Sequence, residues 1–510
     1  MIQEILRRPP WRITALSLAV GLALSACAVG PDFHAPEAPR VADAGHPYTP
    51  AALPAMPASG PSPAYVPQRF VDGQEISATW WEAFQSPAHD ALVQSALQHS
   101  PNVVAAQATL RQAEENYRAE YGSRVFPSVN GSLSAARQRY ALPQSAQIPA
   151  GTTANLFQAG LDLSYTLDLF GGNRRELEAV RAAIDYQRFQ VEATWLSLTS
   201  SVVATAIQEA SLRAQLQVTQ DVVDNANQSL KVINSQVQLG ALARGALLQQ
   251  QTLIAQQQAQ IPPLEKALAQ TRHQLAVLAG RLPGDAGLPA FDIDSLTLPR
   301  ELPLSVPAAL VRQRPDVRAS EALLHEASAQ IGVATAALYP QITLSGGVNR
   351  QSFKIDKLFD TGTTGWSLAA GLVQPIFNGG ALQAQKRAAV AAYDAAQAQY
   401  QNTVLNAFLG VANALRAIDT DADAVTANAE ADRLANEALG LVGRQYQLGA
   451  VSYLASLDAQ RTVLSTRLAL VQARAARFTD TAALFQALGG GWWNTPDAVA
   501  SAASASGATR

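Results

Sequence analysis

The motifs of this chain recur in the same order after about 210 residues. The tetrapeptide Gln-Leu-Gly-Ala stands at 238–241 and again at 447–450. Two further motif pairs keep this order and spacing: 101–103 with 315–317, and 126–129 with 339–342. Self-similarity at a fixed spacing indicates one architecture built twice. We therefore predict a duplicated fold, with a first repeat over residues 76–290 and a second over residues 291–493.

Each repeat contains a helical run too long for an ordinary globular helix. Residues 173–239 contain no Gly and no Pro, and at about 1.5 Å per residue this run forms a helix of about 100 Å. The matching run at 381–448 contains no Pro. A glycine tip and a returning helix follow each run, so we predict helical hairpins at about 173–280 and about 381–488. The Pro pair at 262–263 must interrupt the first returning helix.

Apolar residues on the long runs recur at steps of three, four or seven, which predicts coiled-coil seams. On the last helix the seam positions are Leu454, Leu457, Leu464, Leu468, Val471, Ala475, Phe478, Ala482 and Phe485. Packing against neighbouring helices must hold helices of this length.

Four shorter segments alternate between apolar and polar residues, the pattern of strands with one face of each kind. They lie at about 126–140, 154–169, 340–352 and 364–376. A sheet that spans a bilayer must close, because every backbone group needs a partner, and about eight strands form the smallest barrel that packs. Three chains would supply twelve strands, with the polar faces lining a lumen. The alternative is a soluble sheet packed on the helices.

The N-terminus resembles a bacterial lipoprotein signal. Basic residues precede a short apolar stretch at 13–26, and small residues stand directly before Cys27, the only cysteine. We predict a signal peptide at 1–26 and acylation of Cys27; the alternative is a plain secretory signal with an incidental cysteine. Residues 27–75 are expected to form an extended tether, and the Ala- and Ser-rich residues 494–510 a disordered tail.

Composition excludes several other classes of protein. The formal net charge of −3 provides no basic surface for nucleic acid. The six histidines form no ligand spacing, and no Gly-rich phosphate loop occurs. We therefore expect no metal, no cofactor and no enzymatic activity, so that a partner must supply the energy for any pumping.

At this point the residues resemble a known family, the outer-membrane efflux factors, in the lipoprotein (NodT-like) branch of TolC-like channels. The resemblance runs from Cys27 to about Trp493, and its motifs are CAVGPDF at 27–33, WWEAF at 80–84, RPDVR at 314–318 and LDAQR at 457–461. It implies a mainly α-helical homotrimer with a twelve-strand transmembrane β-barrel, four strands per protomer, continuous with a long α-helical periplasmic barrel. It also implies a periplasmic adaptor protein and an inner-membrane pump, usually of the resistance–nodulation–division (RND) class.

The strongest candidate site follows the second tip. Leu454, Asp458 and Arg461 are spaced by four and three residues, on one helical face. The residues alone favour a seam leucine beside a solvated ion pair. The resemblance places the matching Leu and Asp at the periplasmic constriction. Three Asp458 carboxylates would form a cation-attracting ring there, with Arg461 holding the closed state.

The two tips differ in charge. Gly240 and Gly449 are expected to cap helices or make turns, and the resemblance adds docking of the adaptor at Gly240, Ala241, Gly449 and Ala450. Residues 225–264 contain no acid, and Arg244 lies beside the first turn. A constriction built equally from both tips is therefore left open.

Together these features predict a gated outer-membrane exit duct, lipid-anchored and reaching into the periplasm, for small molecules such as drugs. The alternatives are the duct of a protein-secretion system and a periplasmic adaptor lipoprotein. A periplasmic hydrolase is disfavoured by the absence of an active-site constellation.

Overall fold

The structure, a computed structural model, describes residues 28–37, 67–139, 141, 151, 153–285, 287–304 and 307–494. The predicted signal peptide, Cys27, most of the tether and nearly all of the tail lie outside the described residues. The chain divides into two compact units. Unit 1 comprises Met1–Pro36, Thr109–Arg188 and Ala319–Gln401, and unit 2 comprises Glu37–Ala108, Phe189–Arg318 and Asn402–Arg510. Each repeat contributes to both units, so the compact units do not follow the repeat boundaries.

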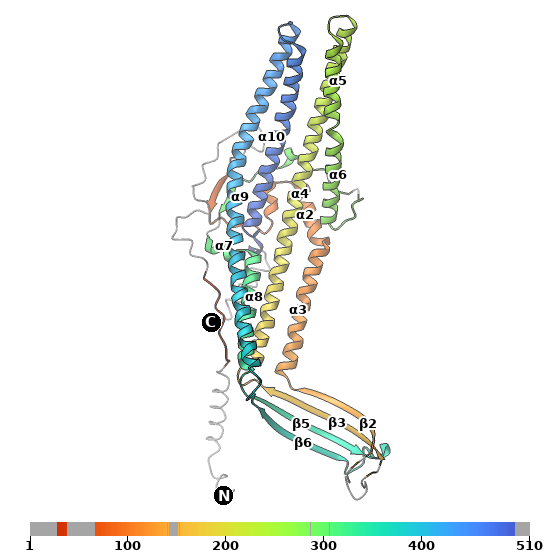
Figure 1. The fold of residues 1–510 in the computed structure, drawn as a ribbon, viewed down its shortest axis with the longest axis vertical. Helices are drawn as coiled ribbons and strands as arrows, with labels where there is room; N and C mark the ends of the chain where they lie inside the picture. Colours follow the sequence, from red (N-terminus) through yellow and green to blue (C-terminus); the bar gives the residue numbers. More distant parts are fainter. Residues whose placement is uncertain are drawn as a thin grey trace. The chain divides into compact units, whose positions relative to one another are not determined.

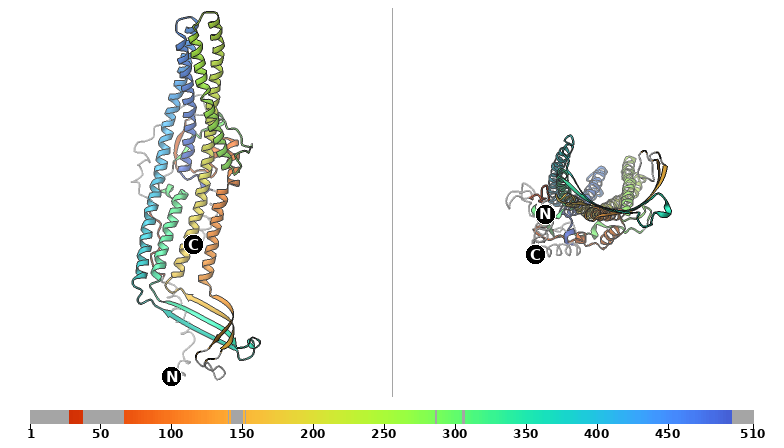
Figure 2. Two further views of the ribbon diagram at one scale, coloured as in Figure 1. Left: turned by 45° about the vertical axis from the view of Figure 1, so that its right-hand side comes forward. Right: turned by 90° about the horizontal axis from the view of Figure 1, so that it is seen from below.

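Unit 1 contains a four-stranded antiparallel sheet in the order β2-β3-β5-β6 (Figure 1). The strands are β2 (Ser128–Arg139), β3 (Thr153–Leu167), β5 (Gln341–Ser352) and β6 (Thr364–Val373). The central pairing of β3 with β5 joins the two repeats, with Leu161 opposite Val348. The view from below in Figure 2 shows that the sheet is curved. These are the four strands that the alternating pattern predicted.

Both edge strands of this sheet are open. Every residue of β2 and β6 is exposed, and each strand pairs with one neighbour within the chain. The exposed apolar side chains of the sheet include Val129, Leu133, Leu161, Val348, Trp366, Leu368 and Leu372. A soluble sheet packed on helices would bury its apolar face, so this exposure argues against the soluble alternative.

The long helices reproduce the duplication. Helices α4 (Gly172–Gln238) and α9 (Ala381–Gln447) both have 67 residues. The first return is divided into α5 (Arg244–Gln258) and α6 (Ile261–Leu278), and the Pro pair lies in the first turn of α6, where a missing N–H costs no intrahelical hydrogen bond. The second return, which contains no Pro, is the single helix α10 (Tyr453–Ala487).

The remaining helices are shorter. They are α2 (Pro87–His99), α3 (Pro101–Val125), α7 (Pro307–Gln313) and α8 (Pro315–Ala336), with 3-10 turns η3 (Trp80–Phe84), η4 (Ile293–Ser295), η5 (Ile355–Lys357) and η6 (Trp492–Asn494). Among the described helices, none combines the length and apolarity needed to cross a membrane.

Aromatic residues anchor the core of unit 2. The Trp80 ring stacks on Phe485 at 5.5 Å between centroids, and Phe84 lies 6.3 Å from Phe478. All four side chains are buried, so the Trp-Trp-Glu-Ala-Phe motif fastens η3 to α10. Beside it a two-stranded parallel sheet pairs β1 (Arg69–Asp72) with β4 (Glu301–Leu304). This sheet was not predicted, because four-residue strands carry too little alternation to be recognised.

The described start of the chain is a strap, residues 28–36, that lies against α4 and α8 within unit 1. The Val29 amide donates to the Phe170 carbonyl at 3.0 Å. The Arg175 guanidinium, 6% exposed, binds Asp32 at 2.6 Å and Glu178 at 2.7 Å. Phe33 stacks on His325 with 4.3 Å between ring centroids. This part of the predicted tether is therefore docked by specific contacts.

We expect Arg175→Met to release the strap. The change removes the donor shared by Asp32 and Glu178, and hydrogen bonds to charged groups contribute about 1.5–3 kcal/mol. Hydrogen exchange of the Val29 amide should accelerate by about thirtyfold, because 1.4 kcal/mol corresponds to a factor of about ten. Asp32→Asn is the matched control and should cost less than about 1 kcal/mol, since Asp32 is mostly exposed. Wild-type protection of Val29 in Arg175→Met would contradict this role.

Candidate functional site

Each helical tip, in unit 2, is closed by the same hydrogen-bonded cap. Gly240 and Gly449 both have a φ of 75°, a left-handed conformation that favours glycine. The Ala241 amide donates to the Gln236 carbonyl at 2.8 Å, and the Ala450 amide to Gln445 at 2.9 Å. Together with the glycine amide bonds to Val237 and Tyr446, this is the Schellman pattern. The expected capping role of both glycines is confirmed.

The two tips pack against each other through a small core. Ile233, Leu253, Tyr453 and Leu457 are buried there, and Val237, Leu242, Ala246, Leu247 and Tyr446 cover them. In Figures 1 and 2 the tips of the α4–α5 and α9–α10 hairpins lie side by side at the same end of the helices. The tips therefore form one surface.

A buried hydrogen-bond chain joins the two tips within this core. The Tyr453 hydroxyl donates to Gln250 Oε1, and Gln250 Nε2 donates to the Ala226 carbonyl at 2.7 Å. Gln250 is fully buried, so its amide depends on these partners. The Tyr446 hydroxyl bonds Gln236 Oε1 at 3.2 Å in a less buried position. Neither tyrosine was predicted; the signal available was that aromatic residues flank the second tip only.

The predicted gate residues lie on the outer side of this core. Leu454 is 50% exposed, so the prediction that it occupies the helix seam is wrong, and the neighbouring Tyr453 and Leu457 fill that role. Arg461 Nη1 lies 3.6 Å from Asp458 Oδ1, with side chains 45% and 64% exposed. Such an exposed pair contributes less than about 1 kcal/mol. One helical face thus presents an apolar side chain, a carboxylate and a guanidinium to solvent.

The first tip presents no comparable face. Arg244 begins α5 and is exposed, and no acid lies within 225–264. What the tips share is one leucine directly before each capping glycine. Leu239 and Leu448 are both 84% exposed, so each tip offers an apolar contact beside Gly240-Ala241 or Gly449-Ala450.

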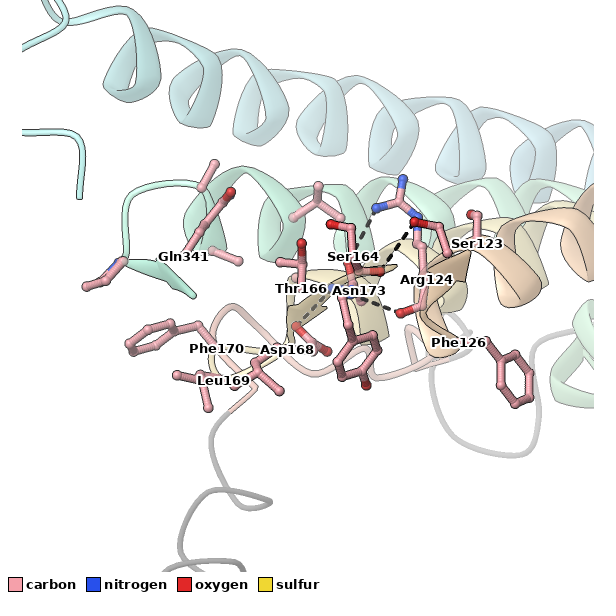
Figure 3. A pocket seen from close by; sticks show the side chains of 18 residues that line it. Ser123, Arg124, Phe126, Ser164, Thr166, Asp168, Leu169, Phe170, Asn173 and Gln341 are labelled. Carbon is pink, nitrogen blue, oxygen red and sulfur yellow. Dashed lines mark hydrogen bonds between the residues drawn. The ribbon is translucent and has the colours of Figure 1, made fainter. Parts of the chain in front are cut away.

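A polar cavity of about 490 Å³ lies in unit 1, where β3 meets α4 (Figure 3). Asp168 caps α4 by accepting from the Asn173 and Arg174 amides, both at 3.0 Å. Arg124 donates to Asn173 Oδ1 at 3.4 Å. The Asp168 bonds fasten the end of β3 to α4, and the Arg124 bond joins α3 to α4. Hydroxyls of Ser123, Ser164 and Thr166 complete the polar lining. The cavity contains no nucleophile–base pair.

Over the described ranges, no three His, Cys, Asp or Glu side chains gather to bind a metal ion. Among the histidines that the structure describes, His89 is strongly perturbed, because burial lowers its pKa to about 4. Its Nδ1 bonds Ser86 Oγ at 2.9 Å, and its ring packs on Phe291. A neutral ring in an aromatic setting fits a core position.

A duplicated chain with four amphipathic strands and two long helical hairpins has the architecture of an outer-membrane channel. The family profile described as "Outer membrane efflux protein" matches residues 92–281 and 306–490, one segment in each repeat. The chain belongs to this outer membrane efflux protein family.

Relatives and solved structures agree with this membership. The chain is 33% identical over 420 residues to the pyoverdine export outer membrane protein OpmQ of Pseudomonas putida, covering 81% of this chain and 88% of the relative. It is 29% identical to the cation efflux system protein CusC of Escherichia coli, covering 94% and 98%. The outer-membrane channel OprN superposes with a TM-score of 0.80 at 26% identity, covering 91% of this chain and all of OprN.

We expect Tyr453→Phe to loosen the contact between the tips. The change leaves the buried Gln250 Oε1 without its donor, at a cost of about 1–3 kcal/mol. Thermal unfolding of the detergent-solubilised protein, followed by circular dichroism, should shift to lower temperature. Tyr446→Phe removes a hydroxyl whose partner is only partly buried, so water replaces it and the shift should be smaller. Equal shifts for both variants would refute the tie through Gln250.

Proposed function

We propose that this protein is the exit duct of a tripartite pump that exports small molecules across the periplasm and outer membrane. The observation that carries the proposal is the continuity of the chain from an amphipathic strand to a distant tip. In each repeat a strand leads, through a short turn, into a helix of 67 residues that ends at a capped glycine. The relatives named for export of pyoverdine, cations and toluene support small cargo.

Three chains complete the duct in this proposal. The open edges of β2 and β6 carry backbone groups that hydrocarbon cannot satisfy, so β2 of one chain pairs with β6 of the next. Three copies contribute twelve strands. The exposed apolar residues of the sheet, among them Trp366 and Leu368, then face lipid. Acylated Cys27 adds a lipid anchor at the start of the strap.

The same proposal assigns the energy source to partners. The duct performs no chemistry, so it depends on an inner-membrane pump, of the RND class by family resemblance, reached through a periplasmic adaptor. The adaptor docks on the tips at Gly240-Ala241 and Gly449-Ala450, where the exposed Leu239 and Leu448 provide apolar contact. The capping glycines bring the backbone close to the surface there.

The gate lies at the second tip. In a trimer, three copies of Asp458 surround the axis near the start of α10, and each is held by Arg461 within its own chain. Three carboxylates in a narrow opening attract cations and repel anions. The first tip, with Arg244 and no acid, does not contribute to this ring.

Mass measurement tests the assembly and the anchor together. Native mass spectrometry of the detergent-extracted protein should give three chains, each beginning at Cys27 with a covalently bound acyl group. Cys27→Ser should lose the acyl mass and keep the threefold complex, because the edge strands and not the lipid join the chains. A monomer without lipid would overturn the trimer, and an unmodified Cys27 would overturn the anchor.

Conductance in planar bilayers tests the duct and its gate. The wild-type protein should form discrete channels that prefer cations. Asp458→Asn should lower the cation-to-anion permeability ratio by about twofold or more, because the ring loses its charge. Glu437→Gln, an exposed acid on α9 paired with Arg433, removes the same charge away from the ring and should leave the ratio unchanged. Absence of channels would defeat the duct, and an unaltered ratio in Asp458→Asn would defeat the gate.

A further inference from the structure

The two helical hairpins of unit 2 hold their buried carboxylates differently. In the first hairpin Glu209 of α4 is fully buried. It accepts from Arg213 on its own helix, from Arg272 of α6 at 2.9 Å and from the Phe291 amide at 3.1 Å. Two guanidiniums and a backbone amide therefore serve one carboxylate at the contact between α4 and α6.

The second hairpin has the opposite balance. The carboxyl groups of Asp421 on α9 and Asp480 on α10 lie within hydrogen-bond reach of each other, and two carboxyl groups share a hydrogen bond only when one is protonated. Asp421 Oδ2 is buried and has no hydrogen-bond partner among the described residues. Burial, with the hydrogen bond and charge of Asp480, raises the pKa of Asp421 to about 7, and Arg477 offsets only part of this rise.

The other charged groups near this pair are already engaged. Arg477 of α10 is buried and donates to Gln68 at 3.2 Å. Arg314 borders the same region and binds Asp316 at 2.7 Å. Arg416 and Asp419, five and two residues before Asp421 on α9, bind each other at 2.8 Å, and Arg474 of α10 binds Asp294 of η4. Arg477 is therefore the cation that acts on Asp421, and its single positive charge offsets only part of the rise in the Asp421 pKa.

The space beside the pair allows the helices to respond. A cavity of about 380 Å³ lies between α9 and α10, lined by Asn413, Ala414, Ala417, Asp480 and Ala483 among others. Its small side chains leave room for water at Asp480. Loss of the proton would place two negative charges together in a half-buried site, and hydration through this cavity relieves their repulsion.

We propose that Asp421 and Asp480 form a proton-dependent clasp that holds α9 against α10, and that the first hairpin has no such response. The clasp closes when one proton is shared between the two carboxyl groups and loosens when both are ionised. Because the second hairpin alone carries Asp458 and Arg461, a change in pH acts on the side of the tips that bears the proposed gate.

The direction and size of the effect follow from linkage. The closed clasp binds a proton more tightly than the open one, so its stability is greatest in acid and falls as pH rises through the pKa of the pair. With an ordinary carboxyl pKa in the open state, the opening constant rises by about tenfold between about pH 6 and about pH 8. Above that range both states are ionised and the opening constant levels off.

Hydrogen exchange of the full chain in detergent tests the clasp without any transport assay. The exchange rate of amides of α9 and α10 around Asp421 and Asp480 should rise about tenfold between about pH 6 and about pH 8. This rise is measured after correction for the pH dependence of intrinsic exchange. Amides around Glu209 and Arg272 serve as the internal reference and should show no such rise. An equal response in both hairpins would overturn the proposal.

Variants separate the clasp from general electrostatics. Asp421→Asn lets an amide donate to Asp480 without a proton, so the rise should shrink to less than about twofold. Asp423 is exposed and lies two residues after Asp421 on the same helix. Asp423→Asn removes an equal charge and should keep the tenfold rise in exchange rate. Asp480→Asn provides the same test if Asp421→Asn does not fold. A persistent tenfold rise in either clasp variant would refute the assignment.

The consequence for gating rests on the proposed function and is measured separately. Open probability in planar bilayers should rise with pH in the wild type and lose that dependence in Asp421→Asn. If hydrogen exchange responds while open probability does not, the clasp stands and its link to the gate fails. If no channel forms, the proposed function fails and the exchange result still decides the clasp.

Discussion

The open edges of the four-stranded sheet are the constraint on which the rest of the molecule depends. Strands β2 and β6 each have one neighbour within the chain, and their exposed faces carry large apolar side chains such as Leu133 and Trp366. Unpaired backbone groups are tolerated in water but are costly in hydrocarbon. A membrane position for this sheet therefore requires further copies of the chain. That requirement demands more than one chain, and the number three in the proposed trimer comes from the family resemblance.

Duplication gives the chain one sheet shared by both repeats and two helices of equal length that end at neighbouring tips. The pairing of β3 with β5 fuses two repeats into one sheet, and helices of equal length carry both repeats to tips with equal caps. Equal lengths matter because the tips must meet to form the small core around Leu253 and Leu457. A helix one turn longer would carry its tip about 5.4 Å past its partner. The fixed spacing of the motifs therefore reflects the packing of the two tips, which requires helices of equal length.

The parts of this fold that could be predicted are those with a local periodic signal. Alternation marked the four strands, long runs without Pro marked the long helices, and Gln-Leu-Gly-Ala marked the caps. The contacts that tie these elements together were not predictable in the same way. Tyr453 and Gln250 are separated by 203 residues, and Arg175 meets Asp32 across 143 residues. Neither pair has a spacing that a single sequence reveals. Leu454 shows the same limit. Its three-residue step to Leu457 fits a seam position, but such a step does not fix which side of α10 is buried.

The two repeats differ in the partners of their buried carboxyl groups, and the periodic pattern of the sequence does not reveal this electrostatic difference. Glu209 accepts from two guanidiniums and a backbone amide, whereas Asp421 faces a second carboxyl group. A buried charge without sufficient counter-charge is neutralised by binding a proton. One hairpin is thereby held by ion pairs, and in our proposal the other is held by a hydrogen bond that exists only while a proton is present. Since both hairpins share the core at the tips, the fixed hairpin provides the support against which the other can move. The asymmetry of the gate residues and the asymmetry of these buried contacts fall on the same hairpin, which is the arrangement expected if that hairpin alone is mobile.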